Sequence, residues 1–162
     1  MTTWNDVLAA APELGALVQA RFEATGLALL ATLRADGAPR ISGIETSFWD
    51  GELWLGSMWE ARKAVDLRRD PRLALHAATV DKEVKEGDAR VAGRAAELDD
   101  EPRKQAFAQR FAEETGYDPN DNGPWHLFHV DVTELSMVRP GGDHLVIDVW
   151  HPGEAPRRIE RR

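Results

Sequence analysis

The amino-acid sequence predicts an α+β protein, built mainly from antiparallel strands that close into a small barrel with flanking helices. The first indication is a series of short apolar or alternating runs separated by tight-turn residues, as at Ala35-Asp36-Gly37 and Pro140-Gly141-Gly142. The second is that helical periodicity interrupts these runs at only two or three places. Many strands joined by tight turns, with few inserted helices, are typical of small barrels.

The N-terminal half is expected to form a helix followed by three antiparallel strands. Between Pro12 and Gly26 apolar residues repeat with helical spacing, and proline and glycine are common at the start and end of helices. The next run is almost uniformly apolar, which suits a strand covered on both faces, and an Asp-Gly turn separates the two strands after it. The expected ranges are 12–26 for the helix and 27–33, about 40–48 and 52–55 for the strands.

The second half is expected to alternate between strands and two further helices. A helix from about Met58 should end at Asp70-Pro71, and a second should begin after Asp99 or Asp100 and end near Gly116. The charged run 81–88 and the polar run 117–123 have the composition of loops. The expected strands cover about 73–78, 89–98, 128–133 and 145–150.

Length and composition indicate one domain. A chain of 162 residues can bury a single core, and we expect an N-terminal helical segment (1–26), barrel strands (27–98 and 125–162) and an inserted helix (99–116). The formal net charge of −8 argues against a general nucleic-acid binder. The chain has no cysteine, and its apolar runs are too short to span a bilayer. We therefore expect a cytoplasmic protein with no nucleic-acid and no membrane partner.

The segment from Gly56 to Lys63 is the first candidate functional site. It leaves an apolar strand, turns through Gly56 and Ser57, and places Arg62 and Lys63 near the start of a helix. Helix N-termini have unpaired N–H groups and a partial positive charge, so two cations there are unfavourable unless an anion binds. A phosphate group is the obvious ligand. Two alternatives stay open: Ser57 and Glu60 have the spacing of a capping box, and the cations could be solvated.

Three segments resemble the FMN-binding split-barrel superfamily, which includes pyridoxamine 5′-phosphate oxidase. They are residues 32–40, similar to its first hairpin; residues 56–71, similar to its strand, phosphate turn and helix; and residues 145–150 with Gly153, Arg157 and Arg161, similar to its closing strand. The resemblance implies a split β-barrel of six to seven strands. It also implies a homodimer in which each FMN lies in a groove between the subunits.

The resemblance further implies which residues bind the cofactor. Those expected at the phosphate are Gly56, Ser57, Arg62 and Lys63; those expected at the ring or ribityl chain are Arg40, Ile41 and Ser42; and the C-terminal group is Trp150, Arg157 and Arg161. The basic C-terminus would close over an anionic cofactor of the partner subunit, or be a solvated tail. The tryptophan would stack on the ring, or pack in the core. Ala61 departs from the oxidase pattern, in which a serine is common at this position.

The expected function follows from the cofactor. A bound flavin accepts the hydride itself, so the protein needs no catalytic side chain, and none is assigned. We expect a flavin-dependent oxidoreductase that transfers a hydride between bound FMN and a small organic substrate. One alternative replaces FMN with the 8-hydroxy-5-deazaflavin coenzyme. The other is a non-catalytic protein that stores or senses a flavin or haem.

Five histidines raise the question of a metal or haem site. His126 and His129 are three residues apart in an expected strand, where their side chains would face opposite sides and could not easily share one ion. We therefore expect no metal site. His144 and His151, beside the last strand, could bind haem or could be exposed loop histidines.

Overall fold

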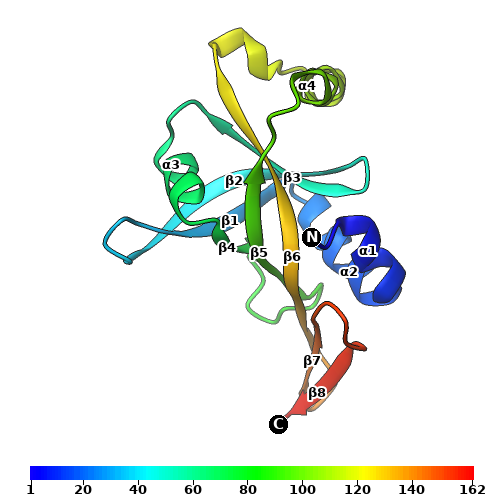
Figure 1. Ribbon diagram of the computed structural model, residues 1–162. Coiled ribbons are helices and arrows are strands. Elements are labelled where there is room, and N and C mark those ends of the chain that lie inside the picture. The colour runs from blue at the N-terminus through cyan, green and yellow to red at the C-terminus, as the bar shows by residue number, and fades with distance from the viewer.

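Eight antiparallel strands form one continuous sheet in the computed structural model, which describes residues 1–162 (Figure 1). The strand order is β3-β2-β1-β4-β5-β6-β7-β8, and β3 also pairs with β6, which closes the first six strands into a barrel. The predicted α+β split barrel is therefore confirmed. The strands are β1 (Leu27–Leu33), β2 (Pro39–Trp49), β3 (Glu52–Met58), β4 (Arg72–Ala77), β5 (Asp88–Glu97), β6 (Trp125–Pro140), β7 (Leu145–Trp150) and β8 (Arg157–Arg161).

The first strand occupies the expected range but has only one covered face. Its side chains alternate, so that Ala28, Leu30 and Thr32 are buried inside the barrel. Leu27 and Leu29 point outward and are 52% and 50% exposed. The expectation of a strand covered on both faces was wrong for this chain, because no element of the fold covers the outer face at these leucines.

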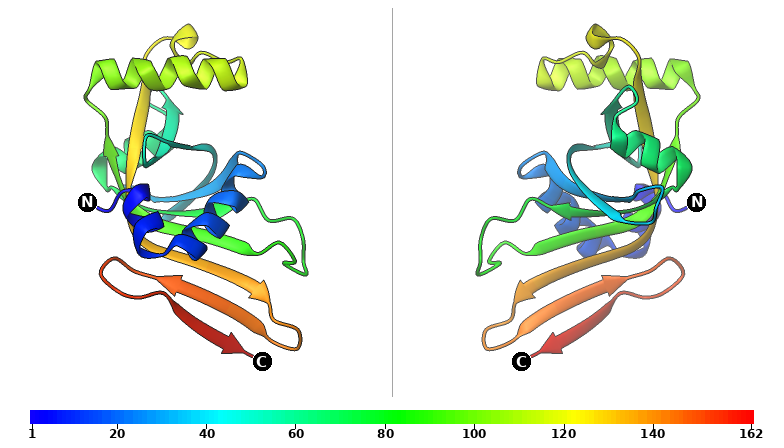
Figure 2. Two further views of the ribbon diagram at one scale, coloured as in Figure 1. Left: turned by 90° about the vertical axis from the view of Figure 1, so that its right-hand side faces the viewer. Right: turned by 90° about the vertical axis from the view of Figure 1, so that its left-hand side faces the viewer.

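Two N-terminal helices cover one side of the barrel (Figure 2). These are α1 (Trp4–Ala10) and α2 (Pro12–Glu23). A capping box between Thr3 and Asp6 starts α1, a separate helix that the periodicity alone had not distinguished. Trp4, Val7 and Phe22 contribute to the main hydrophobic cluster of 25 buried residues, which fills the barrel.

Two further helices surround the candidate site. They are α3 (Arg62–Arg69), between β3 and β4, and α4 (Glu101–Thr115), which is followed by the 3₁₀ helix η1 (Pro119–Asn122). Asp100 caps α4 through its side chain, and Gly116 ends it in a left-handed conformation. In Figure 2, α4 lies across one end of the barrel, where Phe107 packs in a second cluster with Trp54 and Trp125.

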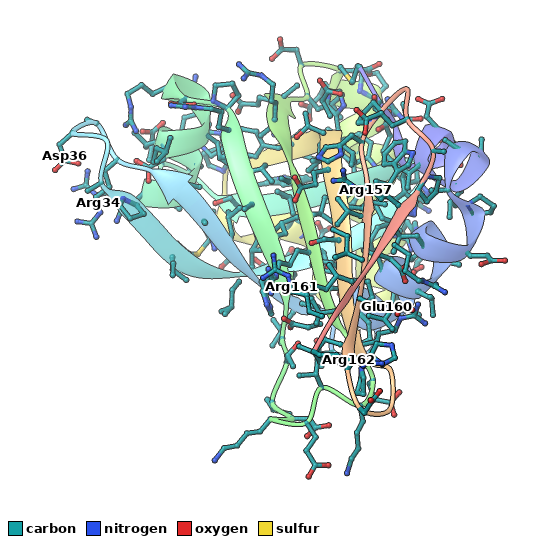
Figure 3. All side chains as sticks on the ribbon, turned by 90° about the horizontal axis from the view of Figure 1, so that it is seen from below. Arg34, Asp36, Arg157, Glu160, Arg161 and Arg162 are labelled. Carbon is teal, nitrogen blue, oxygen red and sulfur yellow. The ribbon has the colours of Figure 1, made fainter.

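The C-terminal strands lie outside the closed barrel. β6 runs for 16 residues, much longer than expected, and its second half pairs with β5 on one edge and with β7 on the other. The last residues form β8 on β7, so the C-terminus is a strand and not a free tail. Seen from below, Arg157 and Arg161 lie on this outer strand, away from the hairpin tip at Arg34 and Asp36 (Figure 3). No helix has the length and apolar character that crossing a membrane requires.

Candidate functional site

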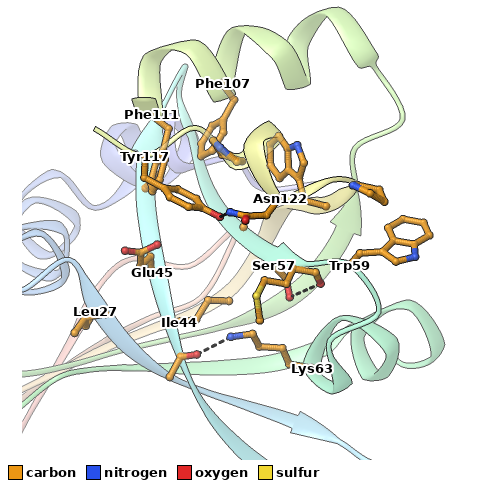
Figure 4. Close-up of a pocket in the computed structure, with 17 residues that line it drawn as sticks. Leu27, Ile44, Glu45, Ser57, Trp59, Lys63, Phe107, Phe111, Tyr117 and Asn122 are labelled. Carbon is orange, nitrogen blue, oxygen red and sulfur yellow. Dashed lines mark hydrogen bonds between the residues drawn. The ribbon is translucent and has the colours of Figure 1, made fainter. Parts of the chain in front are cut away.

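A cavity of about 480 Å³ lies between β2, β3, the start of α3 and the segment formed by α4 and η1 (Figure 4). One end is formed by small or polar residues, namely Gly43, Gly56, Ser57 and Lys63. The other end is mainly aromatic and is formed by Phe107, Phe111, Tyr117 and Trp125. We call these the polar end and the aromatic end. The cavity therefore offers different chemistry to the two parts of a ligand.

The start of α3 is a candidate anion site: of its first turn, Lys63 lines the polar end of the cavity, whereas Arg62 does not. Ala61 is the N-cap residue but provides no side-chain cap, and the first turn holds no acidic residue. The backbone N–H groups of Arg62, Lys63 and Ala64 have no hydrogen-bond partner. Arg62 is exposed and forms no ion pair. Three free amides and two cations at one helix terminus fit a phosphate group.

Lys63 connects α3 to β2. Its Nζ donates a hydrogen bond of 2.7 Å to the carbonyl oxygen of Gly43. Burial lowers the pKa of Lys63, and the negative charge of Glu45 only partly opposes this effect. An anion at the polar end would therefore stabilise the charged form of this lysine.

The helix begins later than the sequence suggested, and the capping box between Ser57 and Glu60, one of the open alternatives, is absent. Ser57 is still part of β3, and its Oγ contacts the Met58 carbonyl at 3.4 Å. The amide of Glu60 donates to His126 and not to a serine hydroxyl. The chain turns at residues 58–61, with Glu60 at a φ of 52°, and this turn delays the helix until Arg62. As a result, Arg62 and Lys63 occupy the first two helical positions.

The residues expected at the flavin ring do not line the cavity of this protomer. The Nε of Arg40 donates a hydrogen bond of 2.7 Å to the buried carboxylate of Asp66 in α3. The same carboxylate accepts a hydrogen bond of 2.9 Å from the Thr32 hydroxyl. Ile41 is 73% exposed on the outer face, and Ser42 lies opposite Leu30 in the β1–β2 ladder. The part of β2 that lines the cavity comes later and consists of Gly43, Ile44, Glu45 and Ser47.

Asp66 fastens α3 to the barrel. Burial by itself would raise the pKa of Asp66, but the hydrogen bonds from Arg40 and Thr32, together with the charge of Arg40, outweigh it, so the pKa is lowered. The carboxylate is therefore ionised and paired at neutral pH. The role of Arg40 in one protomer is to hold the helix that carries the anion site.

The C-terminal candidates also lie away from the cavity. Trp150 is buried in the main hydrophobic cluster, and its indole nitrogen has no hydrogen-bond partner. Arg157 and Arg161 are exposed on β8. A contact between these arginines and a cofactor would require a second protomer, and their binding role stays a prediction.

Sequence reasoning missed the aromatic end of the cavity. Phe107 and Phe111 stack at 5.8 Å, and Tyr117 meets Phe111 edge-on at 6.4 Å. The amide of Asn122 donates to the Tyr117 hydroxyl at 3.1 Å within the supposed loop 117–123, and the amide of Asn120 donates to the Gln105 side chain of α4 at 3.0 Å, which holds this segment against the helix. The signal was available, because aromatic residues flank this polar run on both sides.

Glu45 is the acidic residue of the cavity. Its carboxylate forms no hydrogen bond or ion pair, and it lies between Leu27 and Tyr117 in the view of Figure 4. Register pairing places it opposite Leu27 on the outer face of the barrel. A free carboxylate at this position favours ligands that carry a hydrogen-bond donor or a positive charge near the aromatic end.

The histidines do not line the cavity. His126 is buried under the turn before α3, and His129 packs on Trp54 at 5.8 Å. His144 and His151, at the two ends of β7, contact neighbouring carboxylates. No three His, Cys, Asp or Glu side chains converge where they could hold a metal ion.

Comparisons with known proteins agree on the type of fold. The family model of pyridoxamine 5′-phosphate oxidase matches residues 14–139. No curated protein sequence matches the chain. General stress protein 26 from Bacillus anthracis has a similar structure, with a TM-score of 0.59 and 16% identity over 75% of this chain and 91% of that chain.

Two larger proteins share the fold. Campylobacter jejuni ChuZ gives a TM-score of 0.69 at 15% identity, covering 88% of this chain and 61% of that chain. A haem-binding protein from Mycobacterium smegmatis gives a TM-score of 0.61 at 21% identity, covering 84% of this chain and 57% of that chain. These similarities, all at low identity, concern the fold.

Proposed function

Because this chain belongs to the pyridoxamine 5′-phosphate oxidase family, we propose that it is a flavin-dependent oxidoreductase that binds FMN and a small organic substrate in the cavity. The observation that carries this proposal is the start of α3, where three unpartnered amides lie beside Arg62 and Lys63. That arrangement suits the phosphate of FMN. The lack of cysteine supports a cytoplasmic location.

Two features of the cavity support binding of the rest of the cofactor there. Gly43 and Gly56 line it, and a Cβ at either position would meet no atom within 4 Å. The glycines thus leave open space against two strands where a planar ring can approach the backbone. Its volume of about 480 Å³ is typical of small-ligand sites.

The roles of the protein residues follow from this placement. FMN, when bound, supplies the two-electron chemistry. The amides of α3 and Arg62 bind and orient its phosphate, while Lys63 keeps the helix start against β2. The aromatic end excludes water and provides apolar surface for the substrate, and Glu45 gives that surface a negative charge.

We also propose that the protein acts as a homodimer with the cofactor at the subunit interface. Leu27, Leu29 and Ile41 are exposed on the outer faces of the neighbouring strands β1 and β2. Leu27 also lines the cavity, so the apolar face continues into the site. In such a dimer, Arg157 and Arg161 of one protomer are the candidates for contacts to the cofactor of the other.

Two alternatives use the same fold. An 8-hydroxy-5-deazaflavin coenzyme would place its anionic tail at the same free amides and cations. A non-catalytic haem binder is suggested by the similar haem-binding protein from Mycobacterium smegmatis. The haem alternative has less support, because no histidine lines the cavity.

The test begins with the purified protein as it is isolated. Small molecules released from it are identified by absorbance and mass, and the emptied protein is titrated with FMN, the deazaflavin coenzyme and haemin. We expect FMN to bind and to be reduced by a nicotinamide donor in stopped-flow absorbance. A protein that binds none of the three refutes the proposal, whereas one that binds FMN but neither accepts nor passes on electrons is a binder.

A further inference from the structure

His126 is buried directly beneath the turn that precedes α3. It is 1% exposed and does not line the cavity. The backbone N–H of Glu60 donates to its Nε2 at 3.2 Å, and the ring of Trp59 stacks on it with centroids 4.5 Å apart and planes 8° apart. Two consecutive residues of the turn, Trp59 and Glu60, therefore contact the imidazole of His126 in β6.

The two hydrogen bonds of this imidazole indicate which ring nitrogen carries a hydrogen. A backbone N–H can only donate, so Nε2 must carry no hydrogen in order to accept from Glu60. Nδ1 lies 2.5 Å from the Oε1 of Glu97, and an ionised carboxylate can only accept. A His126 ring with its only hydrogen on Nδ1 satisfies both contacts at once. An imidazolium would carry hydrogens on both nitrogens and could not hold the Glu60 amide.

The same contacts reach the helix that carries the anion site. The second oxygen of Glu97 lies 3.0 Å from the Nε of Arg68 in α3. Arg68 also approaches the carboxylate of Glu60 at 3.5 Å. One network therefore joins β5, β6, the turn and α3, with His126 as its buried member.

The turn has a reason to need this support. Glu60 has a φ of 52°, a left-handed conformation that is unfavourable for a residue with a Cβ. The next residue, Ala61, is the N-cap of α3, so the conformation at Glu60 determines where the amides of Arg62, Lys63 and Ala64 point. The hydrogen bond from Glu60 to His126 holds that conformation.

We propose that His126 is a positioning residue of the anion site: it holds the turn at residues 58–61 so that the start of α3 faces the cavity. This inference rests on the proposed function, since it takes the phosphate of FMN as the ligand of that site. Riboflavin lacks this phosphate and has the same ring. The ratio of the two dissociation constants therefore isolates the contribution of the anion site.

The experiment measures FMN and riboflavin binding by titration calorimetry in four proteins. His126→Phe keeps a ring against Trp59 but removes both polar contacts, and we expect FMN affinity to fall about tenfold, or about 1.4 kcal/mol, with riboflavin affinity unchanged. His126→Gln retains an acceptor for the Glu60 amide and should recover most of the loss. His129→Phe is the control, on the same strand and against another tryptophan, and should match the wild type.

Each outcome decides a different question. Failure of the wild type to bind either flavin refutes the proposed function and this role with it. If His126→Phe keeps the wild-type preference for FMN over riboflavin, the positioning role is refuted and the proposed function is not. The same holds if His126→Phe loses affinity for both flavins equally. The wild type provides a further test without any variant: nitrogen-15 spectra of the ring should show hydrogen on Nδ1 at neutral pH. Hydrogen on Nε2 would contradict the contact to Glu60.

Discussion

The double substitution Arg62→Ala with Lys63→Ala tests directly where a phosphate binds. Arg62 forms no ion pair in the folded protein, so its removal breaks no internal contact. Lys63 loses only its 2.7 Å bond to the Gly43 carbonyl. The fold should therefore survive, and a loss of affinity can be assigned to the ligand.

The expected magnitude follows from the exposure of the two side chains. Exposed ion pairs contribute roughly 0.2–1 kcal/mol, so we assign about 1 kcal/mol to Arg62. Hydrogen bonds to charged groups in more buried positions contribute roughly 1.5–3 kcal/mol, and we assign the lower value to Lys63 because it already satisfies a carbonyl. The sum of about 2.5 kcal/mol corresponds to a loss of about 60-fold in FMN affinity. The smallest loss consistent with this placement is about tenfold.

Titration calorimetry with FMN and riboflavin provides the measurement. The loss should appear with FMN and be small with riboflavin, which carries no phosphate. Lys82→Ala with Lys85→Ala is the matched control, since it removes the same charge from an exposed loop away from the cavity. Wild-type FMN affinity in the Arg62 and Lys63 variant would refute the placement of the phosphate at α3.

Three further predictions concern other parts of the site. Gly56→Val should fill open cavity space and lower flavin affinity at least about tenfold, with an unchanged melting temperature; full binding would exclude the ring from this strand. Ile41→Glu should shift sedimentation from dimer to monomer, and an unchanged dimer would remove this face from the interface. Asp66→Asn should lower the free energy of urea unfolding at pH 7 by about 2 kcal/mol, because Arg40 loses its charged partner. The pKa of Asp66 is lowered in the folded protein. Its contribution to the free energy of unfolding is therefore fully present above the unfolded pKa of about 3.9 and is lost as the pH falls through the folded pKa. The stabilities of the variant and the wild type should converge in acid.

The elements with strong local signals were predictable. The apolar run 27–33 became β1 with the expected ends, and Asp100 with Gly116 bounded α4 as caps do. Prediction failed at the start of α3. There a capping pattern pointed to a helix from Met58, but the partner of Glu60 is a histidine 66 residues away in the sequence. No local pattern can reveal such a contact.

The same limit applies to the site. Gly56, Ser57, Arg62 and Lys63 were expected at a phosphate turn; all of them except Arg62 line the cavity. Arg40 was expected near the ring, but its guanidinium pairs with Asp66, which local sequence could not indicate. The aromatic end was missed because only the tertiary packing brings Phe107 and Tyr117 to the same cavity as β2 and β3.

The sequence by itself determined the strand and turn pattern, the barrel class and a pair of adjacent cations near a helix after β3, because these depend on periodicity and on residues close in the chain. The tertiary structure decided which residues share a cavity, which cation is free and which is paired, and how the turn before α3 is held. Those properties depend on contacts between distant segments, where burial and hydrogen-bond geometry select one partner among several of the same chemistry.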